Sequence, residues 1–175
     1  MEILENLRRK LHLLPLLSNL ETFLDANPER AGRRPGLLAL DVSKRMIGVA
    51  GSDPSWRLAT PLYSIKRTKL QKDIERLQSL LREREAGAVV IGLPLNMDGG
   101  EGPRCQAIRQ FAKDLDQAIN LPAILWDERL TTFEAEERAD EMGLRGPKKN
   151  GLIDAIAAAL ILDDMLQAIE RHSRR

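Results

Sequence analysis

Two short segments of the chain, AVVIGLP (88–94) and the apolar run from Leu121 to Trp126, contain no charged residue. A strand with one face in water alternates apolar and polar residues, whereas a strand covered on both faces is apolar along its length. Each segment is followed by a loop and then by a stretch whose apolar residues recur every three or four positions, as in a helix. This alternation predicts an α/β fold with parallel strands at the centre of its sheet.

Three further strands are predicted before these two. LLALDV (37–42) and RMIGVAGS (45–52) are separated by a very short connection, which indicates an antiparallel hairpin. LATPLYSI (58–65) contains Pro61, which favours a sheet edge. We therefore expect a five-stranded mixed sheet, three antiparallel strands followed by parallel ones, flanked by helices. The predicted helices run from Leu70 to near Gly87, across Ile108 to Ile119, from Thr131 to Met142, and from Leu152 to Ile169 after a basic loop (143–151).

Residues 1–36 precede the first predicted strand and differ in pattern from the rest. Their leucines recur at helical spacing, and DANPERAGRRPG (25–36) is rich in proline, glycine and charge, which is typical of a linker. We expect an N-terminal helical extension and linker (1–36), one α/β domain (37–170) and a basic C-terminal tail (171–175). The apolar stripe of the extension would pack on its own chain or on a second copy, so a homodimer through the N-terminal helices stays open.

Composition limits the class of protein. The 175 residues are 30% charged and 43% hydrophobic, and no apolar run approaches the roughly 18 residues that span a bilayer. Cys105 is the only cysteine, which excludes a disulfide within the chain and favours a reducing compartment, so we expect a cytoplasmic protein without membrane contact. The net charge of +1 neither favours nor excludes a nucleic-acid partner, because the distribution of charge matters more than its sum.

Carboxylates interrupt or end three of the apolar segments. Asp41 lies near the end of the first strand, Asp127 and Glu128 follow the last one, and Asp154 is the one polar residue in an apolar stretch of the final helix. Ligands of mixed sheets bind beyond the carboxyl ends of the parallel strands, so the acids of the first and last strands can converge. Strand alternation sends Asp127 and Glu128 to opposite faces, but it does not choose between them.

Two interpretations of Asp154 are open. An acid near the start of a helix gains roughly 0.3–1 kcal/mol from the helix dipole, and Lys148 or Lys149 could pair with it. Grouped carboxylates, however, repel one another and remain ionised together only beside a metal ion. Hard oxygen ligands suit Mg²⁺ or Mn²⁺, and the sequence has no His or Cys cluster for zinc. Two such ions about 4 Å apart activate water and stabilise a departing phosphate-ester oxygen, so the acids together predict phosphodiester hydrolysis.

The segments that carry these acids resemble a known family. LALDV…IGVAGSDP, VVIGLPLNMDGGEGPR, WDERLTT and DAIAAALIL occur in this order. Across 37–166 the chain is similar to the YqgF family, Holliday-junction-resolvase-like proteins regarded as pre-16S rRNA nucleases. The resemblance implies an RNase H-like fold, a metal-dependent nuclease site at Asp41, Glu128 and Asp154, and a role in maturing the 5′ end of the precursor of 16S rRNA.

The resemblance also favours Glu128 over Asp127 as the metal ligand. At one position the chain departs from the family, because Ser43 stands where a glycine usually follows the first acid by two residues, and a turn that needed a positive φ would be strained there. The predicted nucleic-acid contacts are Arg129, Arg104, Lys148 and Lys149.

The sequence thus predicts an RNase H-like nuclease that uses Mg²⁺ or Mn²⁺ and cuts structured RNA, the precursor of 16S rRNA, or branched DNA. Two alternatives stay open: a non-catalytic ribosome-assembly or RNA-binding factor with a vestigial site, and a Holliday-junction resolvase. An ATP-using kinase of the actin and sugar-kinase kind has a similar first hairpin, but that fold needs two such domains and 175 residues supply one.

Overall fold

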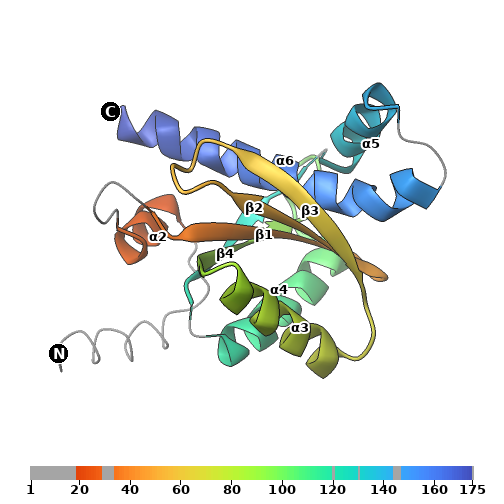
Figure 1. Ribbon diagram of the computed structural model, residues 1–175, viewed down its shortest axis with the longest axis horizontal. Helices are drawn as coiled ribbons and strands as arrows, with labels where there is room; N and C mark the ends of the chain where they lie inside the picture. The colour runs from red at the N-terminus through yellow and green to blue at the C-terminus, as the bar shows by residue number, and fades with distance from the viewer. Residues whose placement is uncertain (1–18, 29–33, 120, 130, 144–146, 175) are drawn as a thin grey trace.

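A computed structural model describes residues 19–28, 34–119, 121–129, 131–143 and 147–174. Its centre is one five-stranded sheet in the order β3-β2-β1-β4-β5 (Figure 1). The strands are β1 (Gly36–Val42), β2 (Met46–Ser52), β3 (Ala59–Lys66), β4 (Ala86–Leu93) and β5 (Ala123–Asp127). β2 is antiparallel to both β1 and β3, β4 is parallel to β1, and β5 is parallel to β4. The predicted mixed sheet is confirmed, including the edge position of β3.

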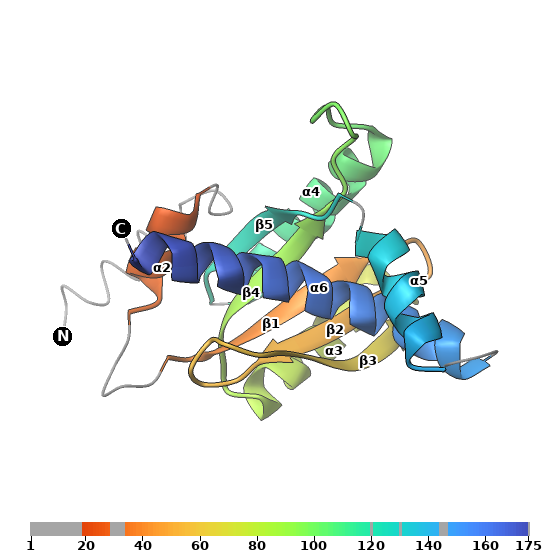
Figure 2. The same cartoon turned by 90° about the horizontal axis from the view of Figure 1, so that it is seen from above.

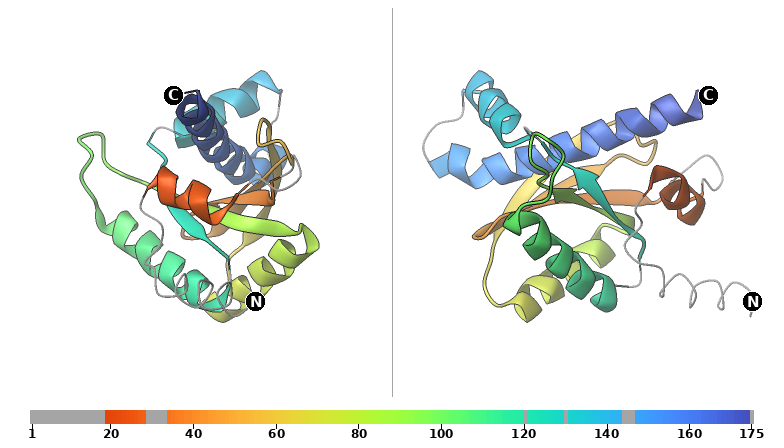
Figure 3. Two further views of the ribbon diagram at one scale, coloured as in Figure 1. Left: turned by 90° about the vertical axis from the view of Figure 1, so that its left-hand side faces the viewer. Right: turned by 180° about the vertical axis from the view of Figure 1, so that it is seen from behind.

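Helices cover both faces of this sheet. They are α2 (Leu20–Ala26), α3 (Leu70–Glu83), α4 (Pro103–Ala118), α5 (Thr131–Glu141) and α6 (Pro147–Ser173). α6 lies across the strands on one face (Figure 2), and α3 and α4 lie on the opposite face (Figure 3). Within the ranges given above, no helix is both long enough and apolar enough to cross a bilayer.

The alternation of β1 separates two cores. Leu38, Leu40 and Val42 are buried against the apolar faces of α3 and α4, whereas Leu37 and Ala39 are buried on the α6 side. Because side chains along a strand alternate, the next residue in the second series, Asp41, lies on the face that α6 covers. The chain thus carries its first acid to the face where the last helix packs.

A glycine on β2 lets α6 approach the sheet closely. A Cβ atom added at Gly48 would lie 1.9 Å from the backbone oxygen of Asp154, a distance that no side chain tolerates. Gly48 pairs with Asp41 in the β1–β2 register, so the contact brings the backbone of Asp154 beside the end of β1. The absence of a side chain at one position therefore decides where the third acid sits.

The last helix begins earlier than the sequence pattern indicated. α6 starts at Pro147 instead of Leu152, so the predicted basic loop 143–151 is helical from Pro147 onward. Proline is favoured in the first turn of a helix, where its missing N–H needs no partner. Leu152 and Ile153, which directly follow the added residues, pack beside the buried Ala135 and Ala139 of α5 and so anchor this end of the helix. Asp154 is consequently not in the first turn, and the helix-dipole interpretation loses its basis.

The N-terminal extension is described only from residue 19. The Asn19 side chain caps α2 by accepting a hydrogen bond from the Thr22 N–H at 2.8 Å. Phe23 is fully buried in the core that contains Leu37 and Trp56, so this part of the extension packs on its own chain. The leucines of 1–18, and the possibility of a homodimer through them, lie outside the described residues.

Candidate active site

Asp41 and Glu128 meet on the α6 face at the carboxyl ends of their strands. Glu128 directly follows β5 and donates its backbone N–H to the Leu93 oxygen at 3.1 Å, which continues the parallel ladder by one residue. On β5, Ile124 and Trp126 belong to the core under α6, so alternation sends Glu128 to that same side. The two side chains are 8% and 7% exposed, and their carboxyl groups share a hydrogen bond.

A second glycine makes room for this pair. A Cβ atom at Gly92 of β4 would lie 1.9 Å from Oε2 of Glu128 and 2.6 Å from Cδ1 of Ile161. β4 lies between β1 and β5, so a side chain at this position would stand where the Glu128 carboxyl group now reaches. The bare backbone of β4 is what allows acids from two non-adjacent strands to meet.

Asp154 faces the same region from α6. A cavity of about 340 Å³ is lined by Asp41, Ser43, Lys44, Arg104 and Asp154, together with three apolar residues of α5 and α6. Arg104 is exposed in the first turn of α4, which follows the glycine-rich loop. The cavity therefore has two carboxylates on its walls and two cations beside them, and Glu128 lies behind Asp41.

The acids shift one another's protonation. Burial, and then repulsion by Asp154, raise the pKa of Asp41 to about 6, although Arg104 and the hydrogen bond from Glu128 counteract them. Burial, and then repulsion by Asp41, raise the pKa of Glu128 to about 8, against the opposing effect of Arg104. Burial also raises the pKa of Asp154. The two carboxyl groups therefore titrate as a pair, and near neutral pH they retain one proton between them.

The donor chemistry of this group suits a hard divalent cation. Carboxylates that must share a proton because they repel each other ionise fully when a cation lies between them. In the described part of the chain, however, no three His, Cys, Asp or Glu side chains lie close enough together to hold one metal ion. The structure thus brings Asp41 and Glu128 into contact, and it places Asp154 on the wall of the adjoining cavity.

Asp127 and Arg129 form a separate pair. Asp127 accepts hydrogen bonds from the backbone N–H and from Nε of Arg129, at 3.0 and 2.8 Å, and lies 2.7 Å from Nη2. The same guanidinium donates to the Met97 oxygen at 3.4 Å. Of the two adjacent acids, Glu128 is the one that reaches Asp41, whereas Asp127 pairs with the exposed Arg129.

Two predicted nucleic-acid contacts remain, and the structure adds a lysine that was not predicted. Lys148 and Lys149 lie in the first turn of α6, where the structure does not describe their side chains. Sequence reasoning missed Lys44, an exposed cavity residue three positions after Asp41 in the β1–β2 turn. The basic pair that Lys44 forms with Arg45 was the available signal, but only the turn geometry shows that it borders the cavity.

Ser43 occupies the β1–β2 turn without strain. Its hydroxyl donates to the Met46 oxygen at 3.1 Å and accepts from the Met46 N–H at 3.0 Å. Among the non-glycine residues that the structure describes, only Trp56 and Glu85 have a positive φ. The turn therefore does not need the conformational freedom of the glycine that the family usually has there.

Comparison with known proteins identifies the family of this chain. The model of the family described as RuvX, Holliday junction resolvase, matches residues 36–168. The chain belongs to the RuvX family. RuvX membership confirms the resemblance drawn from the sequence and makes the chain a phosphodiester-hydrolysing nuclease, which excludes the kinase alternative.

The matches to curated relatives cover most of this chain and most of each relative. A protein of Rhodospirillum rubrum named "Putative pre-16S rRNA nuclease" is 44% identical over 159 residues, 90% of this chain and 96% of the relative. A protein of the same name from Chelativorans sp. is 46% identical over 143 residues, 80% and 89% of the two chains. Among solved structures, "T. thermophilus RuvC in complex with Holliday junction substrate" matches with a TM-score of 0.49 and 13% identity, over 78% of this chain and 96% of that one.

Proposed function

We propose that this protein is a divalent-metal-dependent nuclease that matures the 5′ end of the precursor of 16S rRNA in the cytoplasm. The observation that carries the proposal is the buried Asp41–Glu128 pair, which shares one proton beside a cavity that also contains Asp154 and Arg104. Two mutually repelling acids at strand ends contribute nothing to folding that an apolar pair would not provide better. Their value lies in binding a cation and a phosphate.

Each residue has a role in this proposal. Asp41 and Glu128 would hold Mg²⁺ or Mn²⁺ at the strand ends, and Asp154 would complete the site from the wall of the adjoining cavity. When bound, the ion supplies Lewis acidity and an acidified water. Arg104 already lowers the pKa of both Asp41 and Glu128, and its exposed guanidinium at the cavity would orient a substrate phosphate. Lys44 would contact the backbone of the substrate on the other side of Asp41. Arg129, held by Asp127, would contact a strand that leaves the cavity.

The test uses purified protein and an end-labelled precursor RNA that carries the unprocessed 5′ end. Cleavage is compared in Mg²⁺, Mn²⁺ and EDTA for the wild type and for Asp154→Asn. Asp163→Asn is the matched control, because Asp163 lies on the same helix, lines neither the cavity nor the strand ends, and accepts a surface hydrogen bond from Gln167 at 2.9 Å. We expect metal-dependent cleavage that Asp154→Asn abolishes and Asp163→Asn preserves.

Two other outcomes would redirect the assignment. RNA that is bound but not cut under any metal condition would make the protein a binding factor with a vestigial site. A second substrate arm contains a four-way DNA junction, since the family is described as Holliday junction resolvase. Faster cleavage of the junction than of the RNA would assign branched DNA as the substrate.

A further inference from the structure

A second hollow lies between the edge strand β3 and α3, on the face of the sheet opposite α6. It is a groove of about 660 Å³, lined by residues 63–66 of β3 and by one face of α3. We call it the β3–α3 groove. None of its lining residues lines the cavity beside Asp41, so it is not an extension of the candidate active site.

The β3–α3 groove opens at the same end of the sheet as the acids. Asp41 pairs with Gly48 of β2, and Gly48 pairs with Ser64 of β3, which lines the groove. Adjacent strands are about 4.8 Å apart, so the backbones of Asp41 and Ser64 are separated by about 10 Å across the sheet. Because Asp41 faces α6 and the groove lies on the α3 side of the sheet, a polymer bound at Asp41 would reach the groove by passing over the β1–β2 turn at the strand ends.

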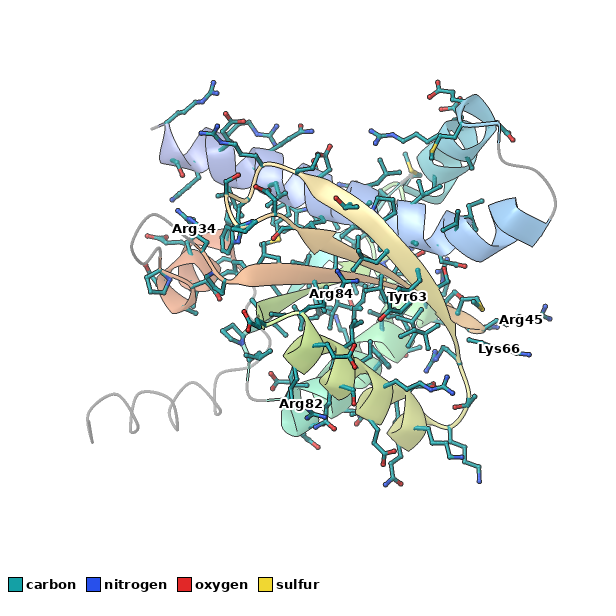
Figure 4. The ribbon with its side chains drawn as sticks, viewed as in Figure 1. Arg34, Arg45, Tyr63, Lys66, Arg82 and Arg84 are labelled. Carbon is teal, nitrogen blue, oxygen red and sulfur yellow. The ribbon has the colours of Figure 1, made fainter. Side chains whose placement is uncertain are left out.

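Exposed cations connect the cavity with the groove. Lys44 lines the cavity, Arg45 follows it in the turn, and Lys66 lines the adjoining end of the groove. Figure 4 shows the side chains of Arg45 and Lys66 projecting into solvent from the same corner of the molecule. Lys72 and Arg76 extend this positive row along α3, and both are exposed.

Acidic residues of the same region offset only part of this charge. Asp73 is fully buried, and hydrogen bonds from Thr68 hold it inside. Glu75 lines the groove and accepts a hydrogen bond from Gln71 at 3.2 Å, and Glu83 lies toward the far end of α3. Lys66, Lys72 and Arg76 therefore outnumber the acids at the end of the groove nearest Asp41.

One side chain fixes the groove relative to the cavity. The Arg67 guanidinium donates to the Ser43 oxygen at 2.9 Å, lies 3.6 Å from the Asp73 carboxylate, and stands 5.4 Å from the centre of the Phe111 ring. It thus ties the turn beside the cavity to the first turns of α3. A ligand that spans both hollows would meet a pre-arranged surface, which lowers the entropic cost of binding.

We propose that the β3–α3 groove binds a single-stranded segment of the RNA substrate next to the bond that is cut. Lys66, Lys72 and Arg76 contact its phosphates, and Tyr63, 38% exposed on β3, packs against a base or a ribose. A basic groove combined with an exposed aromatic ring is the usual device for holding single strands. This inference rests on the proposed function only in taking RNA as the substrate.

Binding is measured by fluorescence anisotropy in EDTA, so that the result does not depend on cleavage. The probes are a precursor RNA with a single-stranded flank, the same RNA with that flank annealed to a complement, and the RNA without the flank. The groove variant is Lys72→Glu/Arg76→Glu. The matched control, Arg57→Glu/Arg171→Glu, makes the same charge change at two exposed residues that line neither hollow.

We expect the groove variant to bind the single-stranded flank at least tenfold more weakly, while the control binds as the wild type does. Its slope of log affinity against log salt should fall by about 1.4, since each phosphate contact to a single strand contributes about 0.7. Affinity for the RNA without the flank should be the same in all three proteins. Tyr63→Ala should lose about fivefold on the flanked RNA, and Tyr63→Phe should restore it because the ring is kept.

The inference is overturned if the groove variant and the control bind the flanked RNA equally, or if the groove variant loses the same factor on all three probes. The outcome is separable from the proposed function. Asp154→Asn that still cleaves, combined with a groove variant that loses the single-stranded flank, would refute the proposed metal site and leave the groove assignment in place.

Discussion

Asp73 and Asp41 are both buried aspartates, but their surroundings differ. Asp73, fully buried on α3, accepts hydrogen bonds from the Thr68 N–H at 2.9 Å and the Thr68 hydroxyl at 3.0 Å, and lies 3.6 Å from the Arg67 guanidinium. Asp41, 8% exposed, shares a hydrogen bond with a second acid, Glu128. The first carboxylate is buried among donors and a cation, whereas the second is buried against another acid, and Arg104 only partly offsets their repulsion.

The difference shows that the partners of an acid, and not its burial, indicate its use. A carboxylate that is surrounded by donors stabilises the fold and has little capacity left for a ligand. A carboxylate that is surrounded by acids costs stability until a cation arrives. Arg67 touches both networks, since it pairs with Asp73 and donates to Ser43 beside Asp41. Asp73 therefore helps, through Arg67, to hold the turn that follows Asp41.

The largest expected effect separates the two acids by activity. Glu128→Gln should lower the rate of RNA cleavage by about 10²–10³-fold, because a neutral amide cannot replace a carboxylate at a divalent cation. Asp73→Asn should retain the cleavage rate per folded molecule within about twofold. Single-turnover kinetics at saturating metal, with circular dichroism to quantify folding, measures both. A comparable rate loss in the folded Asp73→Asn protein would contradict the division between them.

Asp73→Asn and Glu128→Gln should also differ in stability, and here Asp73→Asn is the variant that is damaged. Asp73→Asn keeps an acceptor for Thr68 but loses the charge that faces Arg67, which should cost about 1.5–3 kcal/mol. In a chain of this size that lowers the Tm by about 3–12 °C. Asp114→Asn is the control, since Asp114 is a helix-surface acid that accepts one hydrogen bond from Gln110. If Asp73→Asn and Asp114→Asn both unfold within about 1 °C of the wild type, Asp73 is not a structural acid.

The apolar pattern was sufficient to predict the sheet, because strands that are buried on both faces contain little else. It could not separate Asp127 from Glu128. That choice requires knowing that Ile124 and Trp126 face α6, which depends on packing between segments far apart in the sequence. The loop and last-helix prediction failed at Pro147 for a related reason, since contacts between α5 and α6 override the local turn signals of PKKNG.

The two close approaches of the site illustrate the same limit. Gly48 and Gly92 resemble any other strand glycine in the sequence, and their importance comes from the backbone of Asp154 and the carboxyl group of Glu128 that pass within 1.9 Å of the missing Cβ positions. The β3–α3 groove was equally hidden. Its cations come from a turn, a strand end and a helix face, and only the fold places them in one row.

A smaller effect should appear in the pH dependence of stability. The pKa of Asp41 rises from 3.8 to about 6 and that of Glu128 from 4.5 to about 8, so between about pH 4 and pH 8 the folded chain binds more protons than the unfolded one. The free energy of unfolding must then fall as the pH rises through this window. In EDTA, the Tm of the wild type should fall from pH 5 to pH 8, and Mg²⁺ should reduce the decline.

Glu128→Gln tests the source of that decline, because an amide in place of the acid removes both the titration and the repulsion of Asp41. At pH 8 in EDTA the variant should be more stable than the wild type by about 4 °C or more, with one kcal/mol corresponding to about 2–4 °C. At pH 5 the two proteins should be alike. Parallel curves for the two proteins would show that the paired acids do not titrate together.

The smallest expected effect concerns the turn that joins the two acid networks. Ser43→Gly removes the hydroxyl that bonds to Met46 at 3.0 and 3.1 Å, but it keeps the backbone oxygen that Arg67 contacts. Because the turn has no positive φ at this position, glycine brings no relief of strain and adds freedom to the unfolded chain. The cost should be about 0.5–1 kcal/mol, with cleavage unchanged within about twofold. A several-fold faster Ser43→Gly enzyme would show instead that the serine holds Asp41 away from its best position.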